Sequence, residues 1–186
     1  RDLHSFPTRR SSDLEKINEL AGIAGSTKIT TRAVRHESVH LALPEDCDAK
    51  YDDVVTFDYD IGSYTRPDHA GSIFVGSQGT DFDQDQTVDP DDFDHNFTND
   101  AHEPVYRLAQ RIPTLGIPNQ LRGIVDLWDV TEDWIPVYDC SDLPGYYLAI
   151  GTSGNQFKAA PVVGALMAEL IRSEEHTSEL QSHLNL

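Results

Sequence analysis

A strand, a loop with glycines and a helix follow one another near the end of the 186-residue chain, and this order constrains the fold most. Residues 146–150 form a short apolar run that is typical of a strand. Residues 151–158 then form a loop, and Pro161 stands near the start of an apolar stretch, 160–171, that predicts a helix. The sequence therefore predicts a strand–loop–helix unit.

This loop has the composition of an anion site. Gly151 and Gly154 let the backbone come close to a ligand, because glycine has no side chain. Backbone N–H groups at the start of a helix favour negative charge, and Lys158 adds a full positive charge there. The alternative is an ordinary connection with a solvated lysine.

The remaining elements predict an α+β fold. Between residues 30 and 43, side chains alternate as in a strand, with Val34, His36, Ser38 and His40 on one side and Arg35, Glu37, Val39 and Leu41 on the other. Further strands are predicted at 53–59, 61–66, 72–77 and 123–130, a hairpin loop at 67–71, and helices at 15–24 and 103–112. Because several strands follow one another directly, most of the sheet should be antiparallel.

Composition excludes several classes of protein. The chain has 32 acidic and 14 basic residues, so its net charge of −18 disfavours nucleic-acid binding through a basic patch. No apolar run reaches the about 20 residues that cross a bilayer. Two cysteines make neither a disulfide framework nor a tetrahedral zinc site. The excess of Asp over Lys resembles proteins of salt-accumulating halophiles, although an ordinary acidic protein with one acidic loop remains the alternative.

Both ends of the chain are similar to translated sequencing adapter. Residues 3–14 (LHSFPTRRSSDL) and 172–182 (RSEEHTSELQS) match the codons of two opposite adapters in reading frame. We therefore predict that 1–14 and 172–186 are adapter-derived tails, which are excluded from reasoning about the fold.

The acidic segment from Asp81 to Asp92 supports a rival function. Its carboxylates stand at positions 1, 3, 5, 9 and 12 of a calcium-loop template, but Gln86 occupies the position that needs glycine. The alternative to an enzyme is thus a non-catalytic acidic binding domain that would bind calcium through this segment. A solvated acidic loop is the simpler interpretation, and the sequence predicts no metal site.

The segment Gly151-Thr-Ser-Gly-Asn-Gln-Phe-Lys158 resembles a motif of the D-amino-acid oxidase superfamily of FAD-dependent amino-acid oxidoreductases. The motif is Gly-Xaa-Ser-Gly-His-Gly-Phe-Lys, and the chain departs from it at Asn155 and Gln156. The sarcosine oxidase and dimethylglycine dehydrogenase types are the most similar. Four other segments resemble the family in the same order: 35–37, 63–67, 74–76 and 123–136.

The resemblance implies a domain organisation. Residues 30–118 would form a substrate-binding domain with a mainly antiparallel sheet. Residues 15–29 and 119–171 would belong to an FAD-binding, Rossmann-like domain, the latter as its C-terminal return. The family's N-terminal dinucleotide-binding half is missing, because the chain contains no Gly-Xaa-Gly. We therefore predict a fragment of a longer protein.

The resemblance also implies site residues. Lys158, Tyr64 and Gln78 match catalytic positions, and the cofactor-binding residues would be Gly151, Thr152, Ser153, Gly154, Asn155, Gln156, Phe157 and Lys158. FAD would be non-covalent, because Asp126 stands where some family members carry the cysteine that bonds to the flavin. Phe74 stands where oxidases carry a lysine that promotes reaction with oxygen, which favours a dehydrogenase.

The implied function is oxidation of the C–N bond of a small amino acid or N-methylglycine-type amine by a cytoplasmic enzyme. The electron acceptor and the oligomeric state stay open.

Overall fold

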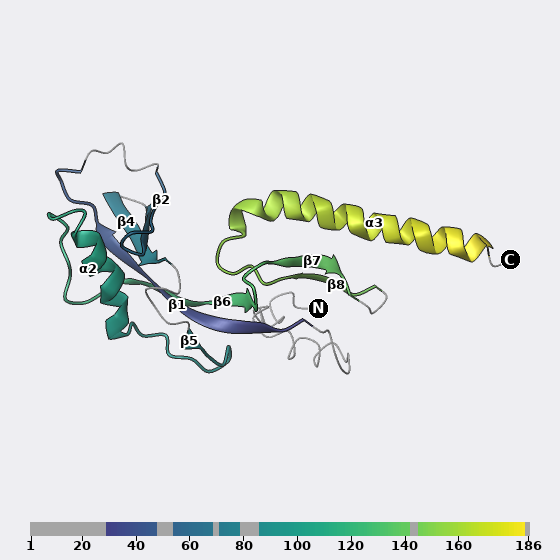
Figure 1. Cartoon of the computed structure of the whole chain (residues 1–186), viewed down its shortest axis with the longest axis horizontal. Helices are drawn as coiled ribbons and strands as arrows, with labels where there is room; N and C mark the ends of the chain where they lie inside the picture. The colour runs from purple at the N-terminus through teal and green to yellow at the C-terminus, as the bar shows by residue number, and fades with distance from the viewer. Residues whose placement is uncertain (1–28, 48–53, 69–70, 79–85, 142–144, 185–186) are drawn as a thin grey trace, which may run out of the picture. The chain divides into compact units, whose positions relative to one another are not determined.

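A computed structural model describes residues 29–47, 54–68, 71–78, 86–141 and 145–184 (Figure 1). The predicted helix at 15–24 lies outside these residues. The chain forms two compact units: the first consists of residues 1–34 and 128–186, and the second of residues 35–127. The predicted domain boundaries stay a prediction.

The second unit is built on an antiparallel sheet. Its order is β2 (Thr56–Asp58), β3 (Ser63–Pro67), β4 (Ser72–Ser77), β1 (Thr31–Ala42) and β5 (Gln86–Thr87), and β6 (Gly123–Thr131) also pairs with β1. The pairs β2/β3, β3/β4 and β1/β4 are all antiparallel. The predicted α+β class with a mainly antiparallel sheet is therefore confirmed, as is the hairpin between β3 and β4.

One face of this sheet carries the apolar core. Val39 and Leu41 of β1 lie opposite Val75 and Ile73 of β4, and all four side chains are buried. The short turn η3 (Asn99–His102) and helix α2 (Glu103–Ala109) cover them, with Ala101, Val105 and Leu108 in the same cluster. Pro104 lies in the first turn of α2, as predicted, because that position needs no backbone N–H.

The other face of the sheet, which we call the second face, carries polar and aromatic residues. Register places Ser38, Gly76 and Tyr64 in one row across β1, β4 and β3, and His40, Phe74 and Arg66 in the next. His36 precedes this set on β1. The predicted alternation along β1 is thus confirmed, since odd positions enter the core and even positions face away from it.

A buried arginine, Arg35 of β1, forms hydrogen bonds to the residues that follow the acidic segment. The guanidinium of Arg35 donates from Nε to the carbonyl of Asp94 at 2.9 Å and also to the carbonyl of Asn96. It pairs at 2.8 Å with Glu37, whose carboxylate accepts from the N–H and hydroxyl of Thr98.

No three acidic, His or Cys side chains of the described residues could hold a metal ion together. Residues 81–85 of the acidic segment lie outside the described residues, so calcium binding through this segment stays a prediction.

In the first unit, β7 (Val137–Cys140) and β8 (Tyr147–Ile150) form an antiparallel hairpin, and helix α3 (Ala160–Leu184) contacts β7 (Figure 1). Strand β8 and the start of α3 agree with the sequence prediction. The prediction that the helix ends at Ile171 is wrong. Residues 172–184 contain neither proline nor glycine, so the backbone continues as a helix.

None of the described helices is long and apolar enough to cross a membrane.

Candidate functional site

Strand β8 leads directly into the loop of residues 151–158, which we call the glycine loop, and η4 (Phe157–Ala159) then leads into α3. Gly151, Ser153 and Gly154 have positive φ angles of 71°, 48° and 73°. A side chain at Gly154 would approach the ring of Trp128 to 2.4 Å, and one at Gly151 would approach Thr131 to 2.3 Å. Both glycines are therefore required by backbone conformation and by packing.

The carboxylate of Asp129 organises the first half of the glycine loop. It is buried on β6 and accepts the N–H of Gly151 at 2.6 Å, the N–H of Thr152 at 3.0 Å and the hydroxyl of Thr152. The carbonyl of Asp129 accepts the N–H of Ser153 at 2.9 Å. A buried carboxylate needs such donors, because burying its charge without them is costly.

Only some N–H groups of the glycine loop are available to a ligand. Those of Gly151, Thr152 and Ser153 bond to Asp129, and that of Asn155 bonds to the carbonyl of Thr152 at 3.1 Å. Among the described residues, the N–H groups of Gly154, Gln156 and Phe157 have no acceptor. The donors available to a ligand are therefore in the second half of the loop.

The side chains of the second half are also placed. The ammonium of Lys158 donates to the carbonyl of Asn155 at 2.7 Å and is exposed. The hydroxyl of Tyr138 donates to the side-chain oxygen of Gln156 at 3.3 Å. The ring of Phe157 is 97% exposed. The loop therefore presents one apolar ring and one cation beside its free N–H groups.

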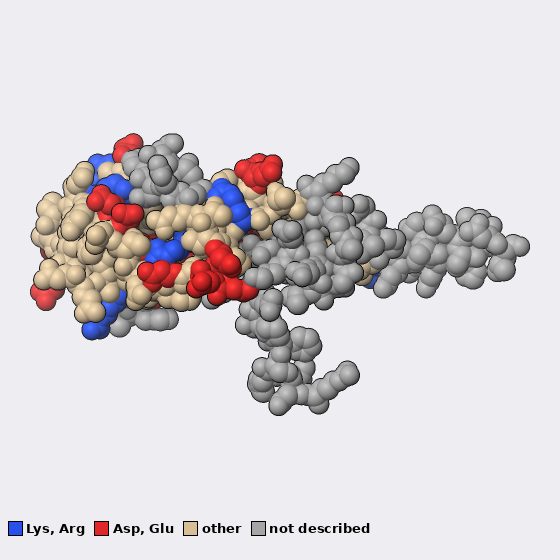
Figure 2. All heavy atoms as spheres, turned by 90° about the horizontal axis from the view of Figure 1, so that it is seen from below, with Lys and Arg blue, Asp and Glu red and all other residues tan. Residues whose placement is uncertain are grey.

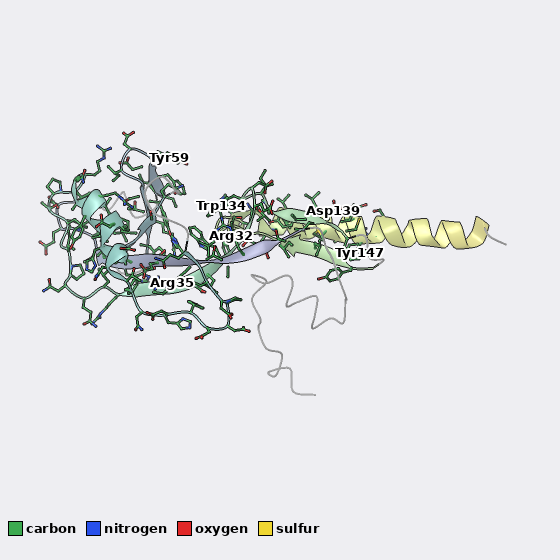
Figure 3. The ribbon with its side chains drawn as sticks, turned by 60° about the horizontal axis from the view of Figure 1, so that its bottom comes forward. Arg32, Arg35, Tyr59, Trp134, Asp139 and Tyr147 are labelled. Atoms are coloured by element: carbon green, nitrogen blue, oxygen red, sulfur yellow. The ribbon has the colours of Figure 1, made fainter. Side chains whose placement is uncertain are left out.

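Aromatic residues support the loop. Trp128 packs against Gly154 and meets Trp134 edge to face, with ring centroids 6.2 Å apart. The guanidinium of Arg32 lies 5.8 Å from the centroid of Trp134 (Figure 3). Trp128 and Asp129 were not among the site residues expected from the sequence. A tryptophan and an aspartate at neighbouring positions of a strand are the signal that could have indicated a packed, hydrogen-bonded partner.

In the second unit, the ring of Tyr64 lies across Gly76, where an added Cβ would come within 2.4 Å of it. Its hydroxyl reaches β1, 3.1 Å from Ser38 Oγ and 3.3 Å from His36 Nε2. Burial raises the pKa of Tyr64. The N–H of Gln78 donates to the carbonyl of Gly62 at 2.8 Å, which continues the β3/β4 ladder beside Tyr64. The structure thus brings Tyr64 and Gln78 to one end of the sheet, whereas Lys158 belongs to the first unit.

His36 is a further residue of this site that the sequence analysis placed only on a strand. Burial lowers its pKa from 6.5 to about 4, so the imidazole is neutral at neutral pH. On the face seen in Figure 2, basic and acidic groups lie beside one another on the described part of the surface.

Replacement of Asp129 should loosen the glycine loop. Asp129→Ala leaves the N–H groups of Gly151 and Thr152 without their acceptor, so we expect a loss of about 2–4 kcal/mol in the free energy of unfolding. Urea unfolding measures this loss. Asp133→Ala is the matched control, because Asp133 accepts hydrogen bonds in an exposed turn of the same unit, from Ile135 N–H and the hydroxyl of Thr131. Equal losses in the two variants would contradict the assigned role.

The lowered pKa of His36 predicts a pH dependence of stability. The unfolded chain protonates His36 near pH 6.5 but the folded chain does so only near pH 4, so stability falls as the pH drops through this window. The full difference is about 3 kcal/mol. We expect the wild type to lose more stability than His36→Gln between pH 7 and pH 4.5, measured by urea unfolding. The carboxylates that titrate in this range are the same in both proteins, so parallel curves would refute the prediction.

Comparison with known proteins gave a consistent result. A family model described as "FAD dependent oxidoreductase" matches residues 16–170. A crystal structure of L-proline dehydrogenase from P. horikoshii matches 86% of this chain and 40% of its own, with 24% identity and a TM-score of 0.64. A crystal structure of glycine oxidase from Geobacillus kaustophilus matches 82% of this chain and 38% of its own, with 18% identity and a TM-score of 0.57. No curated protein sequence matches significantly.

The two structures establish the fold, and the chain spans about 40% of their length.

Proposed function

The chain belongs to the family of FAD-dependent oxidoreductases, and from this premise we propose that it is part of an enzyme that oxidises the C–N bond of a small amino acid or N-methylglycine-type amine. The observation that carries the proposal is the glycine loop, which Asp129 fixes so that three N–H groups remain available. Because the chain spans about 40% of the solved structures that it matches, we propose that the active enzyme is a longer polypeptide.

The residues of the glycine loop fit FAD. The N–H groups of Gly154, Gln156 and Phe157 lack an acceptor within the described chain, as donors to the carbonyl edge of a flavin would. When bound, FAD supplies the two-electron chemistry by accepting hydride from the substrate. We propose that it is held non-covalently, since Asp126 offers no thiol; its carboxylate accepts the N–H of Leu127 at 2.7 Å.

Lys158, Tyr64 and Gln78 would act on the substrate. A substrate carboxylate in a closed site needs a cationic partner, and Lys158 carries the ammonium beside the free N–H groups of the loop. Tyr64 and Gln78 would line the substrate from the second face. These roles come from the resemblance, residue by residue. The position of Lys158 in the first unit and the positions of Tyr64 and Gln78 in the second unit support them.

Phe74 supports a dehydrogenase over an oxidase. It is 6% exposed and lies between His40, 4.8 Å away as ring centroids, and the guanidinium of Arg66, 4.2 Å from its centroid. No ammonium stands at the position where oxidases of the family carry their oxygen-activating lysine. An electron carrier other than oxygen would then reoxidise the flavin.

The complete enzyme tests this function. We expect it to bleach a redox dye without oxygen when supplied with sarcosine, dimethylglycine, proline or glycine, at least one of which should react. Reduction of the dye should be faster than oxygen uptake on the same substrate, because Phe74 replaces the lysine. Hydrogen peroxide formed as fast as the dye is reduced would reverse the dehydrogenase assignment, and a protein without FAD would refute the function itself.

Replacement of Lys158 tests its role. Lys158→Ala should lower kcat/KM by about 10- to 150-fold, which corresponds to the roughly 1.5–3 kcal/mol of a charge-assisted contact. Flavin content should change little, and Lys158→Arg should recover only part, since a planar guanidinium does not replace an ammonium. Steady-state kinetics with flavin content measured alongside decide this. An unchanged kcat/KM in Lys158→Ala would show that the lysine only bonds to Asn155.

A further inference from the structure

The hydroxyl of Tyr64 does not point away from the sheet but back across it. The ring starts on β3 and lies over Gly76 of β4, and its hydroxyl ends beside Ser38 and His36 of β1. Only a residue without a side chain lets the ring take this path, because a Cβ on residue 76 would lie 2.5 Å from the hydroxyl oxygen itself. Three strands therefore cooperate to hold one hydroxyl group.

The two partners of this hydroxyl have different roles. Burial keeps the phenol protonated and the imidazole of His36 neutral at neutral pH, so His36 has one nitrogen that can accept a hydrogen bond. Either hydroxyl of the Tyr64–Ser38 pair can donate, but the bare nitrogen of a neutral imidazole is a stronger acceptor than a serine oxygen. This difference favours donation of the phenol proton to His36 Nε2, 3.3 Å away, with the hydroxyl of Ser38 donating to Tyr64.

We propose that His36 is a positioning residue for Tyr64, which accepts the phenol proton at Nε2 and completes a chain of hydrogen bonds from Ser38 through Tyr64 to His36. Its role in catalysis rests on the proposed function. The near-parallel rings of His36 and Tyr64, with an interplanar angle of 14° and centroids 6.3 Å apart, fix the same geometry.

This direction determines what Tyr64 offers to a substrate. Since its proton is committed to His36, Tyr64 meets the substrate with an oxygen lone pair, which suits an amine N–H and not a carboxylate. The carboxylate is then left to a cation such as Lys158. The amine and the carboxylate of an amino-acid substrate would thus be recognised by different chemistry.

The tautomer of His36 tests the proposal without any assay of activity. In the complete enzyme labelled with 15N-histidine, long-range 1H–15N spectra at pH 7 should show His36 with its proton on Nδ1 and a bare Nε2. His36→Gln identifies the resonance by its loss. Gly76→Ala, which displaces the ring of Tyr64 without replacing either partner, should shift the Nε2 signal, whereas Tyr106→Phe in α2 should leave it unchanged. A proton on Nε2 would reverse the direction and overturn the proposal.

Kinetics separate this inference from the proposed function. His36→Phe removes the acceptor and should lower kcat/KM by about 10-fold, whereas His36→Gln keeps a side-chain oxygen as acceptor and should recover most of the loss. Equal losses in the two variants, or none in either, would contradict a positioning role. If the wild-type enzyme oxidises no amine, the proposed function fails, and the spectra still decide whether His36 holds Tyr64.

Discussion

The hydrogen bonds to the buried carboxylate of Asp129 connect β6 with the loop that follows β8. The carboxylate is stable inside the unit because Gly151 and Thr152 donate to it, and the loop keeps its tight path because Asp129 supplies the acceptors. Neither side can be removed without leaving the other unsatisfied. The same pairing decides which N–H groups of the loop are used internally and which keep no acceptor among the described residues.

A second constraint is the alternation of β1. Its odd positions build the core with β4 and α2, and its even positions build the second face with Tyr64 and Phe74. Arg35 and Glu37 depart from the apolar pattern of the odd positions. They are satisfied by the backbone of residues 94–98, so they hold a connecting segment in place instead of packing with the core.

Local patterns were sufficient to predict much of this fold. The bounds of β4, the hairpin before it and the strand over residues 31–42 follow from alternation and turn residues, which act between near neighbours. Strand β7 was not predicted, because its four residues are too few to show a period. The partners of Asp129 and of Tyr64 could not be predicted either, since they are 22 or more residues away in sequence and meet only through the fold.

The separation of the two faces of β1 has a consequence for how such a protein can diversify. Positions 36, 38 and 40 are not part of the apolar cluster, so exchanges there leave the packing of that cluster intact. Positions 39 and 41 are closed to such exchange, because each buried methyl group contributes to the integrity of the scaffold. Insertion of a single residue before position 36 would swap the two sets and destroy both at once. Sequence variation in this strand is therefore confined to point substitutions at every second residue. These positions are the ones to randomise in a combinatorial library.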